Sequence, residues 1–455
     1  MLRLDAKVRE RIHVFNVHGE ALVLDVATGA VHRLSPAAVA VLGLDGEVTP
    51  AEAAAAATAL GLDPQAGREA LAELSEAAAS GCLFTPDPRP PVGAPPPLRA
   101  LCLNLAQGCN SACRYCFAAP RAAGPTRALM PPGVIRSALD LLLAASVPGA
   151  KVEVDFFGGE PLLNPVGLRY ALEYGSQAAA ACGKTVRFTL TTNALLLTED
   201  ILDLVDGYDV SLILSLDGRP AIHDAMRRTS SDEPTHAAAL ANCKRAATRR
   251  PGDHFIRGTF TAANPDFMPD IHYLVDQGFH RISMEPVVAP AHADYALSPA
   301  HLPALRRSYA DLAEFCLSKR RQGRPFVFFH YELNLERPTC LSKRVTGCGA
   351  GSEYLAVAPD GSLWPCHQFV DREGFGLGDA AAGLAGPGVP ERMWRNTVYA
   401  KSACRGCWAR YLCGGGCHAN AHEFTGDIAS PYTFGCELVR LRLEYALYLA
   451  SRPRG

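Results

Sequence analysis

The chain has 455 residues, and its 44 Lys and Arg against 46 Asp and Glu give a formal net charge of −2. Such a balance argues against nucleic-acid binding, which needs a strongly basic face. The sequence has no apolar run long enough to cross a membrane and no signal-like apolar block near its start. We therefore predict a cytoplasmic protein that binds neither nucleic acid nor a membrane.

Residues 1–86 are predicted to form a small separate domain. Strand-like runs separated by turn residues come first, over residues 12–17, 21–26 and 29–34. Three helices are expected next, starting at Ser35-Pro36 and at Thr49-Pro50 and covering residues 65–79. Residues 87–99 form a predicted linker, because seven prolines fall between Pro86 and Pro97.

Residues 100–325 alternate strand-like runs with amphipathic stretches of helical length. The predicted strands cover residues 100–105, 152–157, 186–191, 210–216, 255–261 and 281–284. The clearest predicted helices cover residues 133–145, 165–182, 198–205 and 268–277. Six such repeats predict an α/β fold with a parallel sheet that curls into a partial (β/α)6 TIM-like barrel. Ligands are expected in the loops at the carboxyl ends of its strands.

Three cysteines follow the first predicted strand directly: Cys109, Cys113 and Cys116. Thiolates suit iron–sulfur clusters, whereas zinc prefers four protein ligands and the sequence has no fourth nearby. Three ligands on a [4Fe–4S] cluster leave one iron open. The Cys-x3-Cys-x2-Cys spacing resembles the signature of the radical S-adenosylmethionine (SAM) superfamily. That resemblance implies that the open iron binds SAM and that electron transfer cleaves it to a 5′-deoxyadenosyl radical.

Further motifs end the next three predicted strands. Gly158-Gly159-Glu160 follows the second strand and resembles the superfamily motif that holds the methionine amino group. Asn193 ends the third strand and Ser215 ends the fourth, where they resemble contacts to the ribose and the carboxylate of SAM. Each could alone be a turn cap. Their order on successive strands favours a cofactor site.

The carboxylate of SAM requires a cation, and Arg227 and Arg257 are the two candidates. Either could instead be a surface ion-pair partner, and the sequence does not choose between them. We include Arg257 among the predicted cofactor-binding residues, together with Tyr115 of the cysteine loop.

Residues 326–455 are rich in Gly, Cys and turn residues and end in a predicted helix over residues 437–450. This region from Cys348 onward resembles the SPASM signature of radical enzymes with auxiliary clusters. By that resemblance, one [4Fe–4S] cluster is bound by Cys340, Cys348, Cys366 and Cys417, and a second by Cys404, Cys407, Cys413 and Cys436. Closed four-thiolate sets are expected to transfer electrons and to hold the fold. The alternative is a pair of structural zinc sites, which Cys404-x2-Cys407 alone would support.

His367 directly follows Cys366. Sulfatase-maturating enzymes share this architecture and have an Asp at that position as catalytic base. The departure argues against formylglycine formation. Because histidine can also act as a base, we predict His367 as the catalytic residue.

Longer stretches resemble maturases that form thioether cross-links in the SCIFF peptide, a group that includes the maturase of quinohemoprotein amine dehydrogenase. They cover residues 256–261, 282–288, 347–351, 407–409 and 414–420. The resemblance implies a radical enzyme that joins a Cys sulfur to a carbon of another residue in a ribosomally made peptide or small subunit. The Ala-, Arg- and Pro-rich composition favours the amine dehydrogenase maturase. Carbon–carbon linkage, epimerisation and a zinc-bound peptide-binding protein are the alternatives.

The amino-terminal domain resembles the winged-helix element that recognises leader peptides. Such an element grips an extended leader along an exposed strand edge. The expected partners are therefore a Cys-containing peptide or small subunit with a leader, and an external electron donor such as flavodoxin or ferredoxin. The alternative for this domain is a small lid or an oligomerisation module.

Overall fold

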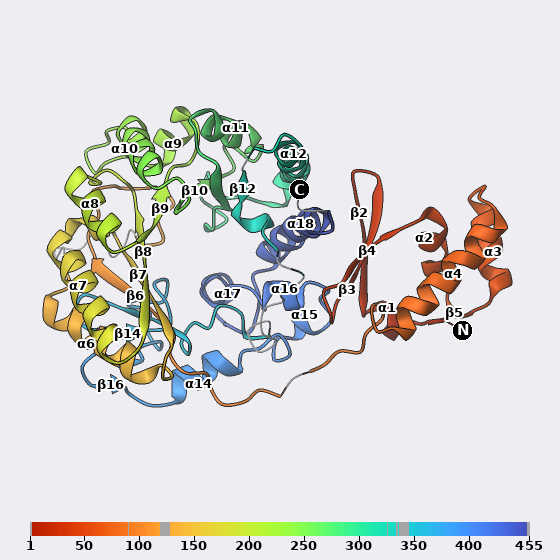
Figure 1. Cartoon of the computed structure of the whole chain (residues 1–455), viewed down its shortest axis with the longest axis horizontal. Helices are drawn as coiled ribbons and strands as arrows, with labels where there is room; N and C mark the ends of the chain where they lie inside the picture. The colour runs from red at the N-terminus through yellow and green to blue at the C-terminus, as the bar shows by residue number, and fades with distance from the viewer. Residues whose placement is uncertain are drawn as a thin grey trace.

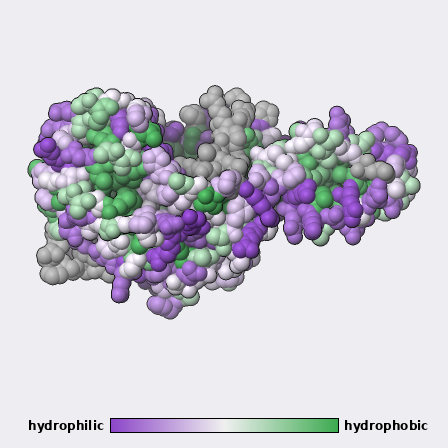
Figure 2. All heavy atoms as spheres, turned by 90° about the horizontal axis from the view of Figure 1, so that it is seen from below, coloured by the Kyte–Doolittle hydropathy of each residue, from purple (hydrophilic) through white to green (hydrophobic). Residues whose placement is uncertain are grey.

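The computed structural model describes residues 2–89, 91–118, 128–324, 326–333, 335 and 345–452. Cys340, a predicted cluster ligand, lies outside these residues. The amino-terminal elements, red in Figure 1, lie to one side of a larger α/β body, and the last helices of the chain, residues 402–450, blue, lie between the two. Figure 2 shows the amino-terminal elements as a lobe that projects from this body.

The amino-terminal lobe contains an antiparallel sheet in the order β2-β3-β4, formed by Ile12–Val17, Glu20–Asp25 and Val31–Leu34. Helices α2 (Pro36–Leu42), α3 (Pro50–Ala59) and α4 (Pro64–Ala79) follow. Ser35 caps α2, and Thr49 forms a capping box with Glu52 at the start of α3, as the start signals predict. All three predicted strands and helices are confirmed. The short α1 (Ala6–Arg9) and the β1–β5 pair (Leu2–Leu4, Gly46–Val48) were not predicted, because three or four residues show no periodicity.

Both faces of this sheet are buried. Val23 packs with Val41 and Leu71 in the core beneath α2 and α4. Leu22 and Leu24, on the opposite face, belong to the main core of the protein together with residues of α18 (Thr433–Ala450). The alternation follows from the two-residue period of a strand. The carboxy-terminal helix therefore closes the second face of the amino-terminal sheet.

The main sheet contains the six predicted parallel strands, which confirms the predicted α/β fold. They are β6 (Ala100–Ala106), β7 (Lys151–Gly158), β8 (Thr185–Thr192), β9 (Ser211–Ser215), β10 (His254–Phe260) and β11 (Arg281–Pro286). Each pairs in parallel with its sequence neighbours. The sheet is curved, with its helices on the outer side (Figure 1).

Both edges of this sheet continue beyond the predicted strands. β12 (Val327–Phe328) extends one edge, and β13 (Tyr354–Val357) pairs in parallel with β6 at the other. Three antiparallel strands then follow β13: β14 (Ser362–Trp364), β15 (Gly378–Asp379) and β16 (Gly383–Leu384). The strands of the carboxy-terminal region therefore extend the main sheet beyond β6, which sequence periodicity did not indicate.

The outer helices cover the apolar side of the strands. They are α6 (Pro132–Ala145), α7 (Pro165–Ala181), α8 (Glu199–Gly207), α9 (Pro220–Met226), α10 (His236–Arg249), α11 (Met268–Asp276) and α12 (Leu302–Arg321). In β7, Val152, Val154 and Phe156 are fully buried in the main core, whereas Asp155 and Phe157 alternate with them and stay partly exposed. The inner side of the sheet is thus the accessible one.

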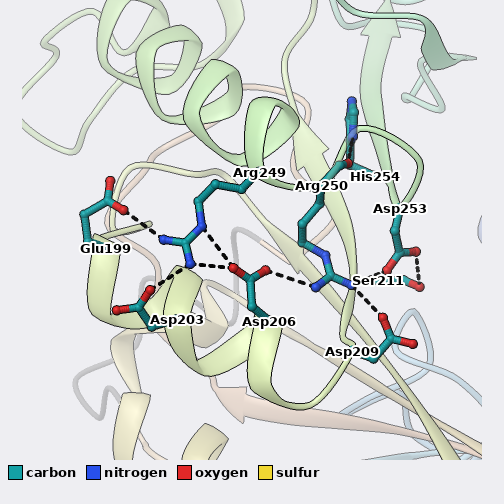
Figure 3. Close-up of polar contacts among 9 residues, drawn as sticks. All are labelled: Glu199, Asp203, Asp206, Asp209, Ser211, Arg249, Arg250, Asp253 and His254. Atoms are coloured by element: carbon teal, nitrogen blue, oxygen red, sulfur yellow. Dashed lines mark hydrogen bonds and ion pairs between the residues drawn. The ribbon is translucent and has the colours of Figure 1, made fainter.

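Ion pairs fasten α8 to the end of α10 on the outer surface (Figure 3). Arg250 pairs with Asp206 (3.0 Å), Asp209 (2.9 Å) and Asp253. Arg249 extends the network to Glu199, Asp203 and Asp206. Although partial burial acts in the opposite direction, hydrogen bonds from the two arginines lower the pKa of Asp206.

The carboxy-terminal region contains short helices α14 (Gly388–Arg395), α15 (Ser402–Arg405), α16 (Arg410–Cys413) and α17 (His418–Thr425) before α18. The proline-rich stretch is attached to this region. Asp87 accepts hydrogen bonds from Tyr399 (2.7 Å) and Arg410 (3.2 Å). α18 is joined to the barrel by Arg442, which pairs with Glu285 of β11 at 3.1 Å. No helix in the described part of the chain is long and apolar enough to cross a membrane.

Candidate active site and cluster-binding cysteines

The cysteine loop at the carboxyl end of β6 brings Cys109, Cys113 and Cys116 together. Burial raises the pKa of Cys109 to about 12, and the charges of Glu160, Cys113 and Cys116 raise it further. Cys113 and Cys116 also interact with each other. The structure therefore groups the three cysteines that the sequence predicts as ligands of one cluster.

The loop after β7 packs directly against the cysteine loop. Gly159 N donates to Ala106 O at 2.8 Å, and Glu160 N donates to Gly108 O at 2.9 Å. A Cβ atom on Gly159 would lie 2.2 Å from Gly108 O, so only glycine permits this approach. The close approach of the two loops therefore explains why this position of the Gly-Gly-Glu motif is a glycine.

Glu160 and Asn193 connect the ends of β7 and β8 to the cysteine loop. The buried carboxylate of Glu160 accepts hydrogen bonds from Thr192 Oγ1 (2.7 Å) and Asn193 N (2.8 Å). Burial raises its pKa to about 7 in spite of these bonds. Asn193 Nδ2 donates to Asn110 Oδ1 at 2.7 Å and lies 3.7 Å from Cys109 Sγ. Both predicted cofactor residues therefore lie beside the predicted cluster.

Asp217, which the sequence analysis did not assign, holds the other side of the cysteine loop. It is fully buried at the end of β9 and accepts hydrogen bonds from Tyr115 Oη, Arg227 Nε (3.0 Å) and Thr259 N (2.9 Å). A charged residue between a buried strand and Gly218 was the available sequence signal. Tyr115 is thus part of a polar clamp that closes the loop onto β9 and β10.

The two candidate arginines have different surroundings. The side chain of Arg227 is only 14% exposed, is paired with Asp217 and lies 5.4 Å from the centre of the Tyr115 ring. Arg257 is exposed and stands opposite Ser215 in the pairing of β10 with β9. Arg227 therefore positions the cysteine loop, while Arg257 and Ser215 lie side by side on the accessible face of the sheet.

His367 lines a pocket together with the two glycines of the Gly-Gly-Glu motif. The pocket is lined by Phe117, Phe157, Gly158, Gly159 and His367, among others. The His367 ring is 4.7 Å from the Phe157 ring and 5.5 Å from the Phe117 ring, measured between centroids. His367 reaches this position because β13 and β14, which precede it, extend the main sheet beyond β6.

The remaining described cysteines of the predicted auxiliary sets also fall into groups. Burial raises the pKa of Cys366 to about 12, and Cys417 and Cys348 raise it further. Burial likewise raises the pKa of Cys404 to about 11, with contributions from Cys413, Cys436 and Cys407. These are the two groupings that the sequence predicts, apart from Cys340.

The donor atoms fit iron–sulfur clusters. Across the described residues, no three His, Cys, Asp or Glu side chains converge on a point that would hold one metal ion. A four-iron cluster does not require such convergence, because each thiolate binds a different iron. Because cysteines bind iron as thiolates, cluster binding is coupled to the release of thiol protons.

Comparisons with known proteins agree with this site. Residues 103–249 match the radical SAM superfamily. A serine-type anaerobic sulfatase-maturating enzyme of Klebsiella aerogenes is 25% identical over 376 residues, which cover 76% of this chain and 87% of that protein. A PqqA peptide cyclase of Xanthomonas axonopodis pv. citri is 24% identical over 354 residues, which cover 74% of this chain and 87% of that protein.

Solved structures share the fold. The structure of native anSMEcpe with bound AdoMet has a TM-score of 0.65 and 18% identity, and covers 78% of this chain and 100% of its own. Streptococcus suis SuiB bound to S-adenosylmethionine has a TM-score of 0.53 and 15% identity, and covers 94% and 98%. The cysteine loop and the Gly-Gly-Glu motif lie within the matched residues. Residues 103–249 therefore form a radical SAM domain, and about three quarters of the chain is similar in sequence to a sulfatase-maturating enzyme and a peptide cyclase.

Proposed function

We propose that this protein forms intramolecular thioether cross-links, joining a Cys sulfur to a carbon of another residue in a ribosomally made peptide or small protein subunit. The observation that carries the proposal is a pocket whose lining includes His367, Gly158 and Gly159. Because Cys366 precedes His367, that pocket adjoins a proposed auxiliary cluster as well as the SAM site.

The residues that would hold SAM and its cluster lie together at the carboxyl ends of β6 to β10. A cluster bound by Cys109, Cys113 and Cys116 would supply the electron that cleaves SAM. Glu160 is a buried acceptor for the amino group of SAM, and Asn193 is next to it. Arg257, exposed beside Ser215, is better placed for the SAM carboxylate than Arg227, which is paired with Asp217.

Thioether formation removes two hydrogens from the substrate. The carbon loses one hydrogen atom, the thiol loses a proton, and one electron is left over when sulfur joins carbon. A ring nitrogen of His367 would take the thiol proton. The rings of Phe117 and Phe157 lie beside the imidazole and would give the pocket an apolar lining. An auxiliary cluster bound by Cys348, Cys366 and Cys417, with Cys340, would supply an acceptor for the electron.

The amino-terminal lobe would select the substrate by binding its leader as an added strand. At one edge of the sheet, β2 is engaged by the carboxy-terminal region: the His13 ring stacks on Trp408 at 3.9 Å, and His13 Nε2 pairs with Glu444 at 3.0 Å. At the other edge, β4 has no second strand partner among the described residues. We assign leader binding to this β4 edge.

The test incubates the anaerobically reconstituted enzyme with SAM, dithionite and the Cys-containing peptide or subunit encoded beside its gene. Each cross-link should make the product two hydrogens lighter and remove one free thiol. A modified product with an unchanged thiol count would refute thioether formation. The matched control replaces Cys109, Cys113 and Cys116 together by Ala, which should abolish SAM cleavage and leave the auxiliary iron in place.

A further inference from the structure

Lys401 is a buried lysine in the carboxy-terminal region. It has no exposed surface and immediately precedes α15, the helix that carries Cys404. Its Nζ donates to Gly415 O at 2.8 Å. No carboxylate in the described part of the chain forms an ion pair with it. The Asp427 carboxylate accepts its hydrogen bonds from Ala429 and Ser430, which lower its pKa, and the charge of Lys401 only adds to this effect. A buried ammonium is costly without anionic partners, so other anions must face Lys401.

The groups that face Lys401 are thiols of both auxiliary sets. Burial lowers the pKa of Lys401, and four cysteines act against that effect: Cys404, Cys413, Cys348 and Cys417. The first two belong to one proposed cluster and the last two to the other. The ammonium is therefore within electrostatic range of both sets, and its hydrogen-bond acceptor, Gly415 O, lies in the loop between Cys413 of one set and Cys417 of the other.

The loop that joins the two sets closes around this lysine. Between Cys413 and Cys417, the chain reads Gly414-Gly415-Gly416, with φ angles of +70°, +92° and +77°. All three lie in the left-handed region that favours glycine. A Cβ atom on Gly415 would lie 3.2 Å from Lys401 Nζ. The glycines thus let the backbone carbonyl of Gly415 approach the ammonium closely.

We propose that Lys401 is a counterion shared by the two auxiliary clusters and that it shifts the reduction potentials of both to less negative values. The inference rests on the auxiliary clusters of the proposed function. Four thiolates around a [4Fe–4S]2+ core leave a net negative charge, and each reduction adds one electron from a low-potential donor without making or breaking a bond. A fixed positive charge in a buried site stabilises the more negative, reduced form.

The experiment uses the full-length chain in which Cys109, Cys113 and Cys116 are replaced by Ala, so that only the auxiliary clusters contribute iron. Lys401→Met is compared with its parent in a dithionite titration monitored by electron paramagnetic resonance. Both midpoint potentials should become more negative. The matched control is Arg405→Gln, which removes an exposed cation next to Cys404 and should shift them much less, because solvent screens it. Unchanged potentials in Lys401→Met, or a shift of only one cluster, would overturn the inference.

Iron content separates the possible failures. A parent protein without the iron of two [4Fe–4S] clusters refutes the auxiliary clusters themselves. If Lys401→Met does not assemble them, Lys401→Gln is titrated in its place, since its amide can still donate to Gly415 O. If neither neutral variant retains the clusters, Lys401→Arg decides: clusters retained with arginine support a counterion, and clusters lost in all three variants show a steric role and overturn the proposal.

Discussion

Replacing Asp217 by Asn tests whether the buried clamp on the cysteine loop is electrostatic. The two carboxylate oxygens of Asp217 accept only from donors: Thr259 N on Oδ1, and Arg227 Nε with Tyr115 Oη on Oδ2. An asparagine has the same shape but carries one NH2 group. In either orientation that group faces a donor, and the charge that balances Arg227 is gone.

The cost follows from the less damaging orientation, with the asparagine NH2 group facing Thr259 N. A buried backbone N–H then loses its acceptor, which costs about 1–3 kcal/mol. Arg227, only 14% exposed, keeps a neutral acceptor in place of an anion, and loss of a charge-assisted bond costs a further ~1.5–3 kcal/mol. We expect Asp217→Asn to destabilise the domain by about 3–5 kcal/mol, the range for a broken buried ion pair.

The assay combines anaerobic denaturant unfolding of the reconstituted protein with measurement of 5′-deoxyadenosine release. Asp217→Asn should lower the midpoint and reduce SAM cleavage, because Tyr115 and Arg227 no longer hold the loop. Asp270→Asn is the matched control: Asp270 is also fully buried and paired with an arginine, Arg219, but within the described residues its side chain accepts hydrogen bonds from Arg219 and Asn264 rather than from the cysteine loop. A loss of stability below ~1 kcal/mol with normal SAM cleavage would show that the clamp is not electrostatic.

Three further predictions follow from the same structure. Burial raises the pKa of Glu160 from 4.5 to about 7. The SAM-free protein should therefore lose stability as the pH rises from about 4.5 through 7, by up to roughly 3 kcal/mol. Glu160→Gln should remove this pH dependence of the unfolding free energy, measured in denaturant titrations at several pH values. His367→Gln should retain SAM cleavage but slow cross-linking by about 10²–10⁴-fold, measured by mass spectrometry, if the imidazole is the base; equal loss of both activities would contradict that role. Arg250→Ala should destabilise the protein near neutral pH, and the difference from wild type should shrink as the pH falls below about 4. The lowered pKa of Asp206 contributes its full stability above the unfolded pKa of about 4, and that stability is lost as the pH falls through the lower pKa of the folded state. An unchanged difference at low pH would show that the loss comes from packing rather than charge.

The spatial arrangement of the proposed clusters bears on how the reaction is organised. Cys366 belongs to one auxiliary set and is adjacent to His367 in the pocket, whereas Cys407 of the other set is adjacent to Trp408, which stacks on His13 of the amino-terminal sheet. One proposed cluster is therefore next to the proposed reaction pocket and the other next to the proposed leader-binding lobe. Lys401 is within electrostatic range of thiols of both sets.

Much of the barrel could be predicted from the sequence. Runs such as residues 152–157 and 186–191 are apolar on the side that meets the helices, and that pattern depends only on neighbouring residues. Capping signals at Ser35 and Thr49 are equally local. The pairing of β13 with β6 could not be predicted, because it joins short segments about 250 positions apart that have no distinctive period of their own.

The residues of the candidate site also divide into those that the sequence predicted and those that it did not. The spacing of Cys109, Cys113 and Cys116 already indicated a cluster with an open iron, because ligands within one loop must lie close together. Asp217 and Lys401 were missed, because a single charged residue has no spacing to interpret. Their importance comes from burial against Arg227 in one case and against thiols of two sets in the other.

By itself the sequence indicated an α/β radical SAM domain and three groups of predicted cysteine ligands, since ligand type and local spacing are properties of the chain. Only the tertiary structure decided which distant groups meet. It placed His367 in the lining of the same pocket as Gly158 and Gly159, left Arg257 rather than Arg227 exposed beside Ser215, and buried Lys401 within electrostatic range of thiols of both auxiliary sets. The position of His367 depends on how β13 and β14 extend the sheet beyond β6, and such long-range contacts arise only when distant segments pack together.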